Sequence, residues 1–434
     1  EVTLHGAGIG TLTVNAGSIL TLNGDLTASG TVTNGNTIAV GDNTLIATGG
    51  TGITGGTVTI GNGTLDATGT ISTLASTGNA TVDGNTGLII TGDSSGDLTT
   101  DGEVTLHGAG IGTLTVNAGS TLTLNGALTA SGAVNVSGAL ATGNNALAQT
   151  VTEAFNVLAT GTVTVGTGTC TIGNLDVTGG SFTQTGINAG TQSATSLVTG
   201  GAGIIRWDFG SNGGTLTLAG NVTPSDGAIS FGHKDVTFTA NATIADGTFY
   251  SVTVANPATV TGQGVFYDLT IANGGTFVAN GNVRIMRHLD INGGGIYTNG
   301  GQTLTFGGAG SENGNIIDDN PAGSKQDLGI VVIQGTGPTT KTAQSGLLFG
   351  SLAINEGSFL SGANDIAVTN DVTGTATWTG GTGAIDIDGD FSLATFTGGS
   401  GTVAIAGDFT GNDFTASSGN TYLSGATVTF ATFY

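Results

Sequence analysis

Polar and apolar residues alternate along most of this chain in short runs of four to six residues. Threonine occupies one set of positions and an aliphatic residue the other, as in TLTVN at 11–15, TVTIG at 57–61 and TLTFGG at 303–308. This period of two predicts short β-strands with one buried face. Gly, Asn, Asp and Ser separate the runs, and these residues accept the backbone angles of tight turns. We therefore expect an all-β protein whose chain changes direction every few residues.

The runs recur at a regular spacing. Three similar segments near the C-terminus begin at Asp371, Asp390 and Asp408, at intervals of 19 and 18 residues, and each carries an aromatic residue. A unit of roughly 17–21 residues with about three strands is one coil of a parallel β-solenoid, or β-helix. The chain then makes about 22 coils, and Phe396 and Phe414, one coil apart, should stack on each other. Expected inward residues are Leu12, Val14, Leu20, Leu22, Val58 and Ile60.

One stretch of the chain occurs twice. Residues 1–30, EVTLHGAGIGTLTVNAGSILTLNGDLTASG, return at 103–132 with two differences. We expect the displacement to equal five or six whole coils, so that the second copy enters the stack in register. Such a cassette is easily duplicated because a solenoid lengthens without rebuilding its core.

Composition divides the chain into parts. All aromatic residues lie at or after Phe155, and all six Lys and Arg residues lie at or after Arg206. We therefore expect an aliphatic solenoid over 1–142, which contains both copies of the cassette, and an aromatic-containing solenoid over 161–434.

Two segments depart from the regular pattern. At the boundary, 143–160 predicts a helix or an irregular coil, because Leu147, Val151, Phe155 and Leu158 fit a helical period. Two ordinary strands are the alternative. The polar segment 310–327, which includes a proline, predicts a loop that protrudes from the coils.

The charge balance excludes some partners. The chain has 82 glycines, a net charge of -23 and only 8% charged residues. A nucleic-acid partner is not expected, because neutralising phosphates requires a basic surface.

No run approaches the roughly 20 apolar residues of a membrane-spanning helix. The sequence begins inside a repeat, so we expect a piece of a longer parent chain. The single cysteine, Cys170, should be a small buried apolar residue.

Few residues carry candidate chemistry. The segment DIDGD places Asp386, Asp388 and Asp390 on one face of a strand and resembles the first half of a calcium-binding EF-hand loop, but the distal Glu is missing. The alternative is a set of solvated carboxylates. In RIMRHLD, 284–290, surface ion pairing is the simplest interpretation. No catalytic residue and no cofactor other than calcium is predicted.

At the level of whole repeats, GTLTVNAGSTLTLNGALTASG at 112–132 and DLTIANGGTFVANG at 268–281 resemble the passenger repeats of bacterial autotransporters and large filamentous adhesins. The resemblance implies a non-enzymatic bacterial protein, extracellular or on the cell surface, that serves as a rigid rod for attachment or fibre building. Glycans of a cell surface or matrix are the partners this suggests. No functional residue carries over from the family.

The C-terminal strand predicts an assembly contact. It carries Phe430, Phe433 and Tyr434 without charge, and unpaired strand edges invite further pairing. We expect the partner to be another copy docked end to end, which would propagate into a filament, or the rest of a longer parent.

Two other functions are weighed against this one. A carbohydrate-active β-helix enzyme, of the polysaccharide lyase or hydrolase type, needs paired carboxylates about 5 to 10 Å apart. Ice binding needs threonines ranked on one flat side over many coils.

Overall fold

The computed structural model describes most of the chain. The described residues are 2–4, 7–85, 87–124, 126–143, 145–149, 154–184, 192–200, 203–207, 215–220, 222–224, 228–230, 235–244, 247–308, 312–335, 339–425 and 427–433. Within them the regular structure is all β-strand, and nearly every strand pairs in parallel with one in the preceding or following coil. The same residues contain no helix long and apolar enough to cross a membrane.

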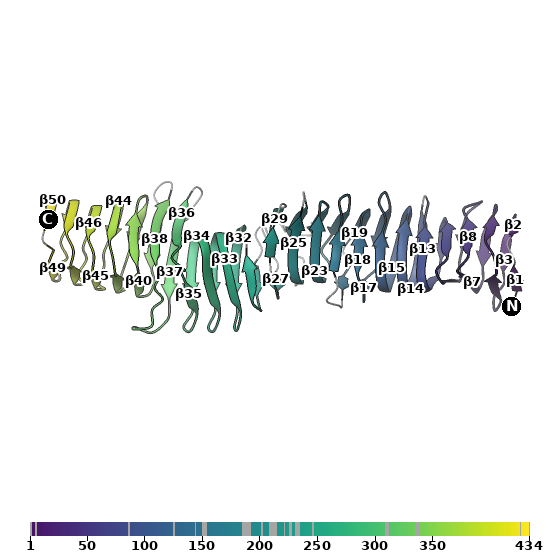
Figure 1. Cartoon of the computed structure of the whole chain (residues 1–434), viewed down its shortest axis with the longest axis horizontal. Helices are drawn as coiled ribbons and strands as arrows, with labels where there is room; N and C mark the ends of the chain where they lie inside the picture. The colour runs from purple at the N-terminus through teal and green to yellow at the C-terminus, as the bar shows by residue number, and fades with distance from the viewer. Residues whose placement is uncertain are drawn as a thin grey trace. The chain divides into compact units, whose positions relative to one another are not determined.

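The strands form β-solenoids, as predicted. The chain has two compact units, residues 1–216 with 224–232 and residues 217–223 with 233–434, and each is a stack of coils (Figure 1). The coils average about 19 residues and number about 20. This is fewer than the expected 22 because some coils carry long excursions: Leu304 pairs with Val331, 27 residues later.

Each coil of the first unit has three sides. In the first coil the sides are β1 (Val2–Leu4), β2 (Ala7–Ile9) and β3 (Leu12–Val14). The chain then returns to the first side with β4 (Ile19–Leu22), where Leu20 pairs with Val2. Gly, Asn and Ser occupy the turns between sides, as the sequence pattern indicated.

The alternating residues point inward and outward as predicted. Val14, Leu20, Leu22, Val58 and Ile60 are buried, whereas Leu12 in the first coil is half-buried. Cys170 is fully buried, as expected for a small apolar residue. The solenoid core is therefore a set of columns in which each apolar side chain contacts its counterpart one coil away.

Aromatic side chains contact one another in the core of the later coils. In the first unit Phe182 contacts Phe155 and Trp207 edge to face, with ring centroids 6.2 and 5.2 Å apart. In the second unit Phe396 and Phe414 stack at 5.1 Å with an interplanar angle of 15°. This confirms the coil length assigned to the C-terminal repeats.

The duplicated cassette is not displaced by whole coils, so that prediction is wrong. Val104, the copy of Val2, lies on the side of Leu12, which is the third side of the first coil rather than the first. Successive pairings run from Leu12 through Val32, Ile53, Gly69 and Leu88 to Val104. The displacement is therefore five coils and two sides. It is tolerated because all three sides are built from the same strand-and-turn unit, so sides as well as coils are interchangeable.

The boundary segment 143–160 forms strands where it is described. β20 (Leu147–Gln149) and β21 (Ala154–Val157) continue two sides of the solenoid, and Phe155 pairs with Val134 of the preceding coil. Val151 lies outside the described residues. The helical alternative is wrong for the described part. The packing of Leu147 and Phe155 against residues of the neighbouring coils stabilises strands here, although their spacing also fits a helix. The division by composition stays a prediction.

The second unit contains a small sheet that supports the candidate site. Its five strands are β40 (Leu347–Phe349), β43 (Ile366–Val368), β45 (Ile385–Ile387), β47 (Val403–Ile405) and β49 (Thr421–Leu423). They pair in that order, one per coil. Apolar residues such as Ile385 and Ile387 point into the core, and the residues between them point outward.

The predicted loop differs from its expected bounds. β37 (Gly314–Asp318) lies in the middle of 310–327, because its alternating residues fit the core and Ile316 pairs with Leu289. The segment without strand structure runs from 319 to 329. We call residues 319–329 the site loop.

Candidate functional site

The site loop is organised by a buried carboxylate, Asp318, which is 1% exposed. One of its oxygens accepts hydrogen bonds from the backbone N–H of Asn320 at 3.0 Å and from the Asn320 side-chain amide at 2.8 Å. The other oxygen accepts the N–H of Gln326 at 2.6 Å. A buried carboxylate is costly unless it is hydrogen-bonded, so this arrangement holds both ends of the loop together.

Further bonds tie the site loop to the neighbouring coils. The Asn320 side chain accepts the N–H of Gly294 at 2.8 Å and donates to the carbonyl of Gly295 at 3.0 Å. Lys325 Nζ donates to the carbonyl of Asp318. The N–H of Leu328 donates to the carbonyl of Leu348 at 3.0 Å, which returns the chain to the five-stranded sheet. The loop is therefore fixed at its base and along its length.

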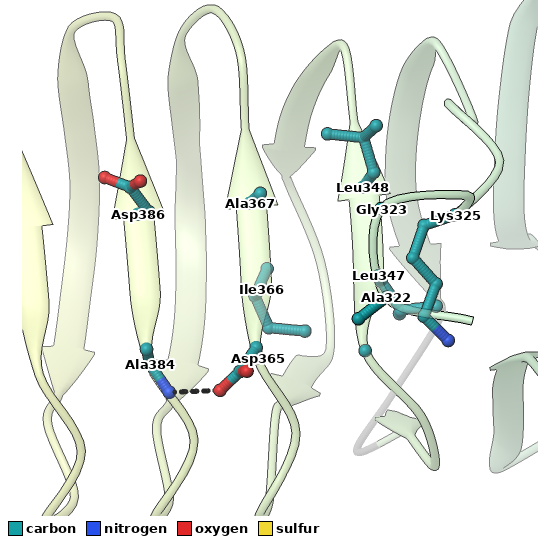
Figure 2. Close-up of a pocket in the computed structure, with 11 residues that line it drawn as sticks. Ala322, Gly323, Lys325, Leu347, Leu348, Asp365, Ile366, Ala367, Ala384 and Asp386 are labelled. Atoms are coloured by element: carbon teal, nitrogen blue, oxygen red, sulfur yellow. Dashed lines mark hydrogen bonds between the residues drawn. The ribbon is translucent and has the colours of Figure 1, made fainter. Parts of the chain in front are cut away.

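A hollow of about 460 Å³ lies between this loop and the outer face of the sheet (Figure 2). Ala322, Gly323 and Lys325 form its wall. Its floor comes from the outward positions of three successive strands. Leu348 on β40 and Ala367 on β43 are half-buried and in register, so they make a small apolar surface. The lining thus combines apolar groups with a few charged ones, the composition typical of ligand sites.

Two carboxylates lie at the floor of the hollow. Asp365 Oδ1 accepts the N–H of Ala384 at 2.8 Å, so part of its hydrogen-bonding capacity is already used (Figure 2). Asp386 is exposed on β45, next in register after Ala367, and no described residue donates a hydrogen bond to its carboxylate. Asp386 is therefore the group in the hollow that remains available to a ligand.

The three predicted calcium ligands do not lie together at one site. Asp386 lines the hollow, whereas Asp388 and Asp390 are exposed outside it. Asp390 Oδ1 accepts the N–H of Asp408 at 2.8 Å, and Asp390 in turn donates its N–H to Asp371 at 2.9 Å. Among the described residues, no three Asp, Glu, His or Cys side chains are close enough to hold a metal ion. Calcium binding stays a prediction without a supporting geometry.

Of the predicted assembly residues, Phe430 and Phe433 are described only in their backbone. β50 (Val428–Phe433) pairs with β48 (Phe409–Thr415), where Phe430 lies opposite Gly411 and Phe433 opposite Phe414. The side chains of Phe430 and Phe433, and all of Tyr434, lie outside the described part. The end-to-end contact therefore stays a prediction.

The ion pairing expected for segment 284–290 is found at Arg287, whose partner lies on the preceding coil. Arg287 Nε donates to Asp268 Oδ1 at 2.9 Å, and its guanidinium lies 5.3 Å from the ring centroid of Tyr250. His288 Nδ1 accepts the N–H of Asn315 at 3.0 Å, and burial lowers the pKa of His288 although Asp268 acts in the opposite direction. The partner Asp268 lies 19 residues before Arg287, and that one-coil spacing is the signal the sequence offered.

Lys341 was not singled out from the sequence, yet its side chain is buried in the core. It is 1% exposed at an inward position of β39 (Thr340–Ala343). Its Nζ donates to the carbonyls of Met286 and Glu312, both at 2.7 Å. Burial lowers its pKa to about 8. Because its donors are engaged by backbone oxygens, Lys341 holds three coils together rather than facing a ligand.

Comparison with protein-family models, with curated proteins and with solved structures finds no match for this chain. The likeness to autotransporter and adhesin repeats therefore stays a resemblance of sequence style.

Proposed function

We propose that this chain is a non-enzymatic structural and adhesive protein, part of a bacterial cell-surface adhesin or of a self-assembling extracellular fibre. The observation that carries the proposal is the contrast between core and surface. The coils are joined by continuous apolar columns, whereas the outward positions hold mainly short, uncharged side chains. Such a surface offers little acid–base or nucleophilic chemistry, and such a core gives mechanical continuity.

One outward column illustrates this surface. Thr13, Thr33, Thr54 and Thr70 succeed one another in register on the third side of the first unit. The column is then interrupted by Ile89 and, further on, by Ala141. The interruptions argue against the regular hydroxyl array that ice binding needs, and they are harmless in a structural surface.

The distribution of basic residues also supports an extracellular role. The chain has no Lys or Arg before Arg206, so trypsin has no site in the first 205 residues. Buried strand columns likewise keep the backbone of the coils out of a protease active site.

The test uses the purified chain coupled to beads. Under flow over a bacterial or host-cell layer, we expect beads with the native chain to be retained more strongly than beads with the heat-denatured chain. The coated chain should also survive trypsin. Equal retention of native and denatured beads would contradict the adhesive proposal.

The hollow supports a second candidate, a carbohydrate-active enzyme. Asp365 and Asp386 lie on adjacent coils and are offset by two residues, which separates their Cα atoms by about 8 Å. Glycoside cleavage uses carboxyl groups about 5 to 10 Å apart, a separation that two side chains on this Cα spacing can reach. Release of reducing ends or unsaturated sugars from polysaccharides, lost in Asp386→Asn, would favour the enzyme over the adhesin.

A further inference from the structure

We propose that the hollow binds a glycan segment without acidic groups, which lies across the outer face of the five-stranded sheet. This proposal rests on the proposed adhesive function and names the chemistry of its ligand.

The first argument is that the site is already formed. Asp318 and Asn320 fix the site loop through hydrogen bonds of 2.6 to 3.0 Å to its own backbone and to the preceding coil. A ligand therefore does not have to order the loop on binding. Preorganisation of this kind lowers the entropic cost of association.

The second argument is the pattern of the floor. Leu348 and Ala367 offer an apolar surface, on which the C–H face of a pyranose ring can pack. Asp386, next in register, offers a carboxylate that no described residue engages. Carboxylates accept strong hydrogen bonds from hydroxyl groups. An apolar surface with an adjacent acceptor fits a sugar, which has both kinds of surface.

The third argument is that the floor continues beyond the hollow. In register after Asp386 come Ala404 on β47 and Tyr422 on β49. Ala404 is small and leaves the path open, and Tyr422 is 56% exposed, which is unusual for so large a ring. At about 4.8 Å per coil, the five positions from Leu348 to Tyr422 span about 19 Å. This length accommodates several linked sugar rings.

The charges select the class of glycan. Two carboxylates face the ligand, whereas the single cation of the hollow, Lys325, already donates to the carbonyl of Asp318. Uronic acids and sulfates would therefore be repelled, and neutral or amino sugars would be accepted. An extended peptide fits less well, because the backbone groups of β43, β45 and β47 are already paired with one another.

The experiment measures binding of the full chain by isothermal titration calorimetry. The probes are chitohexaose and cellohexaose as neutral glycans, and a hyaluronan hexasaccharide as the acidic one. We expect binding of a neutral probe and none of hyaluronan. Asp386→Ala and Tyr422→Ala should each weaken binding about tenfold, the loss expected for one charged hydrogen bond or one aromatic contact.

Asp388→Ala is the matched control. Asp388 is exposed just after the end of β45, two residues along the chain from Asp386, and its substitution removes the same charge outside the hollow. Its affinity should equal that of the wild type. Equal losses in Asp386→Ala and Asp388→Ala, preference for hyaluronan, or no binding of either neutral probe would overturn the proposal.

The bead assay separates this proposal from the broader one. If the wild-type chain binds neither neutral probe but beads that carry it are retained, the glycan proposal fails, the adhesive function stands and another ligand class is involved. If native beads are not retained at all, the adhesive function itself fails, whatever the calorimetry gives.

Discussion

At the scale of single residues, Lys341 shows what a solenoid core demands of a charged side chain. An inward position places its amine among apolar columns, and the two carbonyls of Met286 and Glu312 replace the water it loses. Nothing in the local sequence TKTA distinguishes this lysine from an exposed one. The acceptors lie 29 and 55 residues earlier in the chain, so only the stacking of coils reveals them.

This environment makes stability depend on pH. Burial lowers the pKa of Lys341 to about 8, against 10.5 for its ordinary value. Below pH 8 both folded and unfolded chains carry the proton, so folding bears the full cost of burying the charge. Between pH 8 and 10.5 the folded chain releases the proton first, and the free energy of unfolding rises with pH.

We expect this rise to reach at most about 3 kcal/mol. It should be seen in urea unfolding at pH 7 and 10.5, and Lys341→Met should lose it. Lys325→Met, which leaves Lys341 in place, should keep the rise of the wild type. An unchanged pH dependence in Lys341→Met would refute the assignment.

A second prediction at this scale tests the inward and outward register. Leu122 is fully buried and Thr123, the next residue, points outward. Leu122→Ala should lower the free energy of unfolding by about 2 to 5 kcal/mol because it leaves a cavity in a column. Thr123→Ala should change it by about 0.5 kcal/mol or less, as expected for a surface position. Similar effects of the two substitutions in urea unfolding would mean that the register is wrong.

At the scale of elements, the regular strands were predictable and the site loop was not. The alternation of Thr with aliphatic residues predicts the strands directly. The 18-residue interval between Phe396 and Phe414 predicts the length of one coil. The wall of the hollow depends instead on Asp318, Asn320 and Lys325. Their partners lie on other coils or across an irregular loop, and no periodic pattern marks such contacts.

The loop itself gives a prediction. In Asp318→Ala, the N–H groups of Asn320 and Gln326 lose their acceptor, so the site loop should open more often. Trypsin should then cut after Lys325 at least about tenfold faster, the change that corresponds to about 1.4 kcal/mol of opening free energy. Mass spectrometry of the early fragments checks the site of cleavage.

Asp319→Ala is the control for this experiment. Asp319 is exposed, and its carboxylate accepts no hydrogen bond from the described residues. Cleavage after Lys325 should stay at the wild-type rate. Equal acceleration in both variants would show that Asp318 does not hold the loop.

At the scale of the whole molecule, the duplicated cassette reveals which unit can be exchanged. The copy at 103–132 keeps the local pairing of the original, since Val104 pairs with Leu122 as Val2 pairs with Leu20. It nevertheless lies on a different side of the coil. The sequence showed that the segment is repeated, but not that the copy lies on a different side of the coil. The number of residues per side varies, so the side on which a residue lies follows only from the strand pairings.

The last prediction follows from this modularity. Deleting residues 20–37 removes one coil, because Ile38 takes the place of Leu20, Leu45 that of Leu26 and Ile53 that of Val32. Every remaining inward residue keeps an inward neighbour. In a stack whose stability is a sum of coil and interface contributions, the shortened chain should keep its β-sheet circular dichroism and cooperative unfolding. Deleting 20–36 instead leaves Thr37 opposite Val2, and a one-residue slip turns an apolar set outward. This second variant should bind a hydrophobic dye and unfold at lower urea, and equal stability of the two deletions would show that column register does not govern this fold.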